Sequence, residues 1–90
     1  MAKVEVRMAI DPFHVIRRAL GKSRKHTRVG KIVSVDYDEE ADVLYAKFTQ
    51  RKTVDSEPLD DDGMVVASLD SRQHMTGLTI MHASNLARSH

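Results

Sequence analysis

Residues 35–45 read VDYDEEADVLY and decide the fold class of this chain. Val35 and Tyr37 alternate with the polar Ser34 and Asp36 before a short acidic run from Asp38 to Asp42. The stretch that begins at Val43 after this run places Leu44, Ala46 and Phe48 on one face. Alternation with a period of two is typical of strands that bury one face, and a short polar run between two such strands is typical of a turn. The stretch therefore predicts a β-hairpin.

Two further strands are expected after the hairpin. Residues 64–69 and 76–83 are rich in apolar side chains and are separated by a polar turn. The stretch 55–63 is turn-rich and allows at most a short edge segment, because Pro58 cannot donate to a central ladder. Together the strands predict an antiparallel β-meander. Ser84 is expected to cap a last short helix.

The N-terminal third has a different pattern. Residues 4–10 alternate between apolar and mostly polar side chains, which predicts a half-buried strand. Asp11 and Pro12 then predict the start of a helix that ends near Gly21, since Asp caps free N–H groups and Pro suits the first helical position. The apolar face of this helix is expected to consist of Phe13, Ile16, Ala19 and Leu20.

The basic run 22–30, KSRKHTRVG, has no apolar periodicity and reads as a loop or linker. It divides the chain into a basic strand–helix arm with its linker over residues 1–30 and a small antiparallel-sheet domain over residues 31–90. The expected fold class is α+β and mainly β. It comprises an N-terminal strand and short helix, an antiparallel β-meander and a short C-terminal helix.

The composition is that of one small globular domain. Of 90 residues, 41% are hydrophobic and 30% are charged, which excludes a disordered chain and a two-domain enzyme. The absence of cysteine excludes disulfides and thiolate metal sites. The longest apolar runs have four residues, so no membrane span is expected and the cytoplasm is the expected location.

The net charge of +1 conceals two regions of opposite charge. Residues 1–31 carry a net +7 and residues 32–90 a net −6. A basic arm can bind nucleic acid, or it can complement the acidic body of its own or a neighbouring subunit. It lacks interleaved aromatic residues and a helix-turn-helix pattern, so base-specific binding is not indicated. The nucleic-acid hypothesis rests on Arg17, Arg18, Lys22, Arg24, Lys25, Arg28 and Lys31.

No catalytic or metal-binding motif is evident. The five histidines include no pair at a metal-ligand spacing, and neither acidic run fits a twelve-residue calcium loop. The four glycines stand singly and form no phosphate loop, and there is no Gly-x-Ser-x-Gly pattern. We therefore expect a non-catalytic protein without a cofactor or metal, with an uncharacterised enzyme as a third hypothesis after protein binding and nucleic-acid binding.

Both faces of the expected sheet carry apolar side chains. One face has Val33, Val35, Leu44, Phe48, Val65, Leu69, Leu78 and Ile80, and the other has Ile32, Val43, Tyr45, Met64, Val66 and Met81. A single antiparallel sheet usually has one polar face, so the helix over 12–20, a partner subunit or both must cover the second face. We expect a homodimer whose interface includes Tyr45, Met64, Val66 and Met81.

Two motifs resemble a small prokaryotic family catalogued as domain of unknown function 2283. The opening motif consists of Tyr37-Asp38, Ala41-Asp42 and Leu44-Tyr45, and the closing motif is GLTIMHAS over residues 77–84. The resemblance extends from Lys31 to Ser84, although Thr79 stands where the family usually has Glu. It implies a small antiparallel-sheet domain of unestablished activity. Some members are encoded beside toxin-like proteins, which implies an antitoxin-like or accessory role through protein binding.

The opening motif also has a structural explanation. Asp38 and Asp42 are expected to accept N–H groups of the turn, and Tyr37 and Tyr45 flank it. We therefore interpret these four residues as a hairpin-fixing motif and not as a catalytic site.

Overall fold

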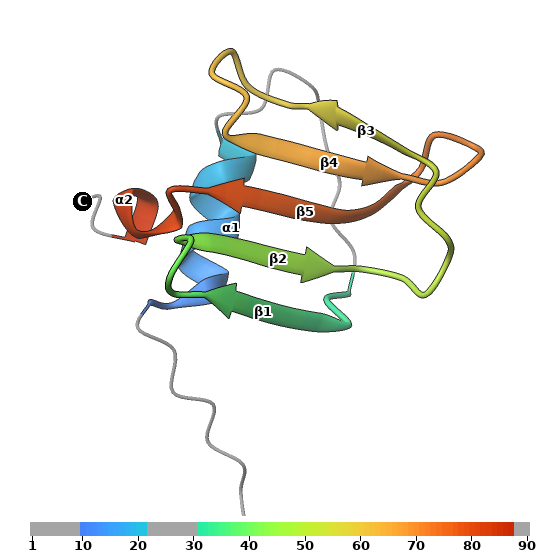
Figure 1. Cartoon of the computed structure of the whole chain (residues 1–90). Helices are drawn as coiled ribbons and strands as arrows, with labels where there is room; N and C mark the ends of the chain where they lie inside the picture. Colours follow the sequence, from blue (N-terminus) through green and yellow to red (C-terminus); the bar gives the residue numbers. More distant parts are fainter. Residues whose placement is uncertain (1–9, 22–30, 88–90) are drawn as a thin grey trace, which may run out of the picture.

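Five antiparallel strands form one sheet in the computed structural model, which describes residues 10–21 and 31–87 (Figure 1). Helix α1 (Pro12–Gly21) precedes the sheet and helix α2 (Ala83–Ala87) follows it. The strands are β1 (Ser34–Asp38), β2 (Val43–Lys47), β3 (Asp55–Pro58), β4 (Val65–Leu69) and β5 (Met75–Met81). This confirms an antiparallel, mainly β fold with a short helix at each end.

Parts of the sequence prediction fall outside this description. The expected strand over residues 4–10 lies, apart from Ile10, outside the described residues, and so does the linker over 22–30. The division of the chain at residue 30 therefore stays a prediction. No helix within the described ranges has the length and apolar character needed to cross a membrane.

The strand order differs from the expected meander. The order is β1-β2-β5-β4-β3, so the connection from β2 to β3 passes along one end of the sheet and β5 lies between β2 and β4 (Figure 1). This is a Greek-key arrangement. The burial of the strands gives the reason. Strand β5 is the most buried and gains two hydrogen-bonded neighbours at the centre, whereas the polar β3, which contains Pro58, suits an edge.

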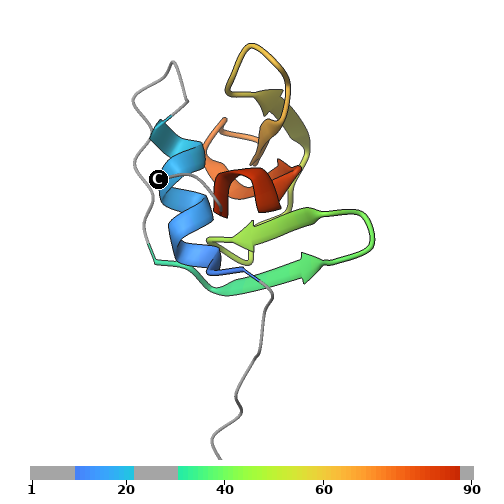
Figure 2. The same cartoon turned by 90° about the vertical axis from the view of Figure 1, so that its left-hand side faces the viewer.

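Helix α1 covers one face of the sheet, which we call the inner face (Figures 1 and 2). As expected of a cap, the Asp11 Oδ1 atom accepts the N–H groups of Phe13 and His14, at 3.1 and 3.4 Å. The buried side chains of the helix join those of the strands in one core, which contains Val15, Ile16, Ala19, Leu44, Ala46, Leu59, Val65, Ala67, Leu69, Leu78, Ile80 and Ala83.

Two details of the expected packing are wrong. Phe13 is 56% exposed, while Val15 is fully buried, because the helix turns the Val15–Ile16–Ala19 side and not the Phe13 side toward the sheet. Ile32 packs against the core and Val33 is 47% exposed, which reverses their expected faces. The strand alternation does not extend to these two residues, because β1 begins only at Ser34.

Candidate functional site

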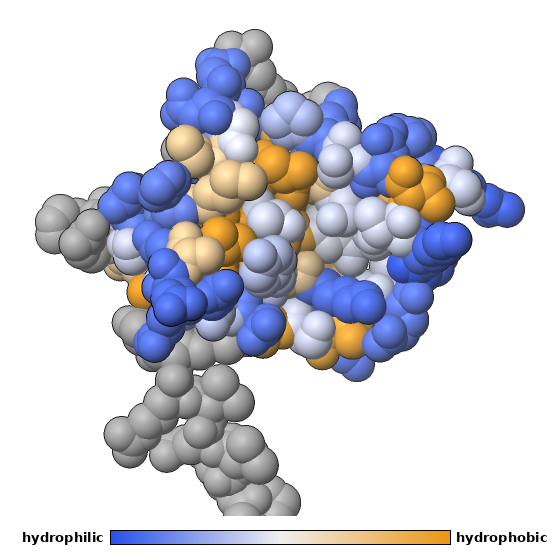
Figure 3. Space-filling view, in the orientation of Figure 1, coloured by the Kyte–Doolittle hydropathy of each residue, from blue (hydrophilic) through white to orange (hydrophobic). Residues whose placement is uncertain are grey.

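The face of the sheet opposite α1, the outer face, has no helix of the described residues packed on it (Figure 1). Figure 3 looks onto this face. Cross-strand pairs define one row of side chains across all five strands. This row consists of Asp36, Tyr45, Thr79, Val66 and Pro58. The outer face therefore has a continuous mixed surface on which the four residues predicted for an interface can be located.

The apolar side chains of the outer face gather on one half of it. Val43 pairs with Met81, and the Met81 N–H donates to the Met64 carbonyl oxygen at 2.8 Å, so this group adjoins the row that holds Tyr45 and Val66. Tyr45 is 44% exposed and Met81 40%, and the other three are half-buried. We call these five residues the apolar patch. It contains all four residues predicted for the interface, and Val43 joins them.

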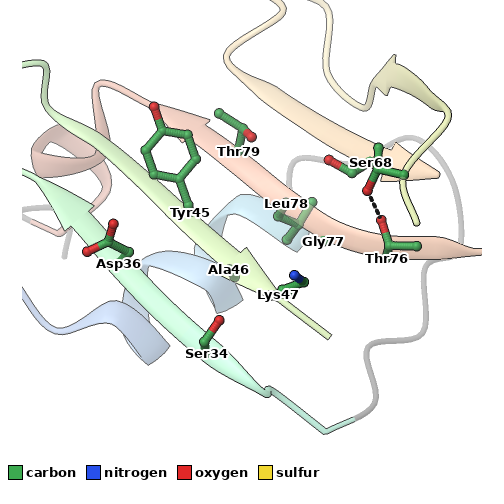
Figure 4. A pocket seen from close by; sticks show the side chains of 11 residues that line it. Ser34, Asp36, Tyr45, Ala46, Lys47, Ser68, Thr76, Gly77, Leu78 and Thr79 are labelled. Carbon is green, nitrogen blue, oxygen red and sulfur yellow. Dashed lines mark hydrogen bonds between the residues drawn. The ribbon is translucent and has the colours of Figure 1, made fainter. Parts of the chain in front are cut away.

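The other half of the outer face is polar. Its row consists of Ser34, Lys47, Gly77, Ser68 and Ser56. A shallow hollow of about 240 Å³ lies over Gly77, and Figure 4 shows hydroxyl groups around it, among them that of Thr76, which lies 2.7 Å from the Thr53 hydroxyl. Gly77 is required here because a Cβ atom would lie 2.5 Å from the Ala46 carbonyl oxygen. The hollow thus follows from close packing of two strands.

Asp42 connects the first hairpin to the end of the chain. Its Oδ1 atom accepts the Tyr37 hydroxyl at 2.6 Å and the Ser84 N–H at 3.0 Å, and its Oδ2 atom accepts the Ser84 hydroxyl at 2.7 Å. Its carbonyl oxygen also accepts the Ala83 N–H at 3.1 Å. Asp42 has a φ of 58°, a left-handed conformation that Asp tolerates better than most residues. It therefore caps α2 from a distant part of the sequence.

The hydrogen bonds of this cluster fix its protonation states. The hydrogen bond to Asp42 raises the pKa of Tyr37 to about 12, with burial and the nearby carboxylates acting in the same direction. Burial acts to raise the pKa of Asp42, but the hydrogen bonds from Tyr37 and Ser84 outweigh it and lower that pKa. At neutral pH Tyr37 is therefore a donor and Asp42 an ionised acceptor. The Ser84 hydroxyl is a donor to a carboxylate, which fits a structural role.

The structure separates the four residues of the predicted turn motif. The Asp38 Oδ1 atom accepts the N–H groups of Glu40 and Ala41 within the turn, at 3.1 and 3.2 Å. Asp42 instead receives Tyr37 and Ser84, and Tyr45 points away from this cluster on the outer face.

The expected role of Ser84 is reversed. It was expected to cap α2, but it lies inside the helix and is capped by Asp42. The motif that ends in Ala83-Ser84 was the only sequence indication of this contact.

Asp70 is the one fully buried carboxylate among the described residues, and sequence reasoning missed it. It is 5% exposed, and its Oδ1 atom accepts the N–H groups of Arg72 and His74 at 2.8 and 2.9 Å. The Arg51 Nε atom lies 3.0 Å from its Oδ2 atom. The hydrogen bond from the His74 backbone is the main cause of its lowered pKa, with Arg72 and Arg51 adding to it against the effect of burial. Asp70 therefore shapes the β4–β5 turn.

The residues of the nucleic-acid hypothesis are only partly described. Arg17 is exposed and Arg18 is half-buried, both on α1, and Lys31 is exposed before β1. Lys22, Arg24, Lys25 and Arg28 lie outside the described residues. Within the described part of the chain, no group of three His, Asp or Glu side chains is placed to hold a metal ion.

These features define a small, mainly β domain with one helix-covered face. Residues 34–84 match the family described as Protein of unknown function (DUF2283), and because the match covers more than half of the chain, the chain belongs to this family. Neither the comparison with curated proteins nor the comparison with solved structures gave a match. The matched region contains all five strands and ends at Ser84, the residue that Asp42 binds, whereas α1 lies outside it.

Proposed function

We propose that this chain is a non-catalytic protein-binding domain that forms a homodimer through the apolar patch. The observation that carries the proposal is the arrangement of the sheet. Helix α1 covers the inner face, while Val43, Tyr45, Met64, Val66 and Met81 collect on the outer face. Contiguous apolar side chains on an uncovered sheet face are typical of an interface.

The charges around the patch are self-complementary. Asp36 lies beside Tyr45 on the neighbouring strand, and Lys47 follows Tyr45 two residues later on the same face. In two sheets packed face to face, a twofold axis that passes near Tyr45 and bisects the directions to Asp36 and Lys47 places Asp36 of each copy opposite Lys47 of the other. The same patch thus serves both subunits, as an isologous interface requires.

The size of the patch sets what else must be buried. A standard interface buries about 800 Å² on each partner. Five partly exposed side chains supply only part of that area, so the polar half of the outer face must form the rim. A polar rim beside an apolar centre agrees with the usual anatomy of a protein interface.

The test is the molar mass of the chain and of two variants in solution. The wild-type chain is expected at twice its 10.2 kDa mass in light scattering at about 100 μM, a concentration above the dissociation constant of a moderately stable dimer. Tyr45→Asp places a charge in the centre of the patch and is expected to give the monomer. Gln50→Asp is the matched control, because it adds the same charge at an exposed position of the β2–β3 connection, outside both rows of the outer face. A monomeric wild-type chain, or loss of the dimer in both variants alike, contradicts the proposal.

A further inference from the structure

The two ends of the sheet carry opposite charges. The β1–β2 and β3–β4 turns lie at one end, on the left in Figure 1, and their acidic side chains are those of Asp38, Glu39, Glu40, Asp60, Asp61 and Asp62. The β2–β3 connection and the β4–β5 turn lie at the other end and hold Arg51, Lys52 and Arg72. We call these three cations the basic end. These three cations lie within residues 32–90, whose net charge is −6. The fold therefore gathers positive charge at one end of a region that is acidic overall.

Asp70 orders this end of the molecule. The β4–β5 turn wraps around its carboxylate, which fixes the backbone of Arg72, and the same carboxylate holds the Nε atom of Arg51 at 3.0 Å. The Arg51 side chain is nevertheless 59% exposed, so its guanidinium is anchored on one side and open to solvent on the other. An arginine held in this way offers its remaining donors with little loss of side-chain entropy.

The three cations border one hollow. It has a volume of about 360 Å³ and is also lined by Val54, Asp70 and Ser71. The Asp70 carboxylate is engaged by Arg51 and by two backbone N–H groups, and the neighbouring Asp55 accepts the N–H of Ser56 at 2.8 Å. Within the described residues, no carboxylate forms an ion pair with Lys52 or Arg72, and both are exposed. Three cations line the hollow against the single carboxylate of Asp70, so its lining has a net positive charge, although the neighbouring Asp55 keeps its negative charge.

We propose that the basic end binds the phosphodiester backbone of nucleic acid. Arginine and lysine are the side chains that proteins use for phosphate oxygens, and such contacts need no deep pocket. An acidic protein segment, in contrast, needs apolar anchors to bind stably, and among the residues that line the hollow only Val54 is of that kind, at 55% exposure. The acidic turns at the opposite end repel a polyanion and orient it toward the basic end. Because the contacts go to phosphates, the binding is independent of sequence. With no aromatic side chain lining the hollow, it does not involve stacking of single-stranded bases.

The test measures how the affinity for a random DNA duplex depends on salt. Three phosphate contacts give a slope of about −2.7 for log K against log salt concentration, which is a loss of about 40-fold in affinity between about 50 and 200 mM salt. The double variant Lys52→Gln/Arg72→Gln keeps one contact, so its slope is expected to fall to about −0.9 and its loss to about 3.5-fold. Arg17→Gln removes an exposed arginine on α1 and is expected to leave the slope unchanged. Thermal unfolding of each variant checks that it folds.

Each possible result supports or overturns the proposal. No binding to the duplex at low salt overturns it, and so does an unchanged slope in the Lys52→Gln/Arg72→Gln variant. A reduced slope in Arg17→Gln with wild-type behaviour in the double variant moves the site to the N-terminal arm. Competition by poly-glutamate at the same charge concentration as duplex assigns the basic end to an acidic protein instead. The proposal requires that duplex competes and that poly-glutamate does not.

Discussion

Asp42→Ala tests the contact that joins the first hairpin to the end of the chain. The change removes the acceptor of three hydrogen bonds, from the Tyr37 hydroxyl, the Ser84 N–H and the Ser84 hydroxyl. At about 1 kcal/mol for each bond, the loss is about 3 kcal/mol. The φ of 58° adds about 1 kcal/mol, because alanine tolerates the left-handed region less well than aspartate. The expected total is about 4 kcal/mol, a large fraction of the stability of a small domain.

Urea unfolding followed by circular dichroism measures this loss, and Asp38→Ala is the matched control. Asp38 also accepts two N–H groups, but it is exposed and its bonds stay within one turn, so its loss is expected at about 1 kcal/mol. Asp42→Asn measures the contribution of the charge apart from that of the backbone conformation, since asparagine is neutral but keeps the left-handed preference and one acceptor oxygen. If Asp42→Ala destabilises the chain no more than Asp38→Ala does, the hydrogen bonds between Asp42 and Ser84 do not stabilise the packing of the first hairpin against α2.

Three further outcomes follow from burial and hydrogen bonding. Leu44 is fully buried, so Leu44→Ala is expected to lower the free energy of unfolding by about 2–5 kcal/mol, more than truncation of the half-buried Phe48, in the same urea assay. The pKa of Tyr37 is raised from 10.0 to about 12, so the hydroxyl stabilises the fold below pH 10 and this contribution is lost between pH 10 and 12. A Tyr37→Phe variant should lack that step in a pH series of melting temperatures, and an identical step in both chains would contradict the assignment. Gly77→Ala should cost about 1–3 kcal/mol, because its Cβ meets the Ala46 carbonyl oxygen, and an unchanged melting temperature would refute this packing.

Local features of the fold could be predicted from the sequence because short-range physics determines them. The Asp11 cap and the acidic hairpin turn depend on residues within four positions of one another. Strand alternation also assigned Tyr45 and Val66 to the same face. These predictions needed no knowledge of how distant segments meet.

Features that depend on distant segments could not be predicted. Strand β5 lies between β2 and β4 because its burial favours the centre of the sheet, and no local pattern specifies that position. The contact between Asp42 and Ser84 depends on the pairing of β5 with β2, which brings Met81 next to Val43.

The basic end depends on the same topology. It brings Arg51 and Lys52 beside Arg72 across two separate connections. In the sequence an acidic stretch separates Arg51 and Lys52 from Arg72. The sequence pattern therefore indicates only an acidic region and no basic cluster within it.

The proposed homodimer is tested most directly by the solvent accessibility of methionine methyl groups in NMR spectra. A soluble paramagnetic agent broadens the signals of exposed methyls, and Met81 is 40% exposed in the single chain. The dimer predicts that Met81 and Met64 are protected at high protein concentration and become accessible on dilution or in Tyr45→Asp. Met75, which packs against the core from the other side of the sheet, should not change. A Met81 signal that is broadened equally at all concentrations would contradict an interface at the apolar patch.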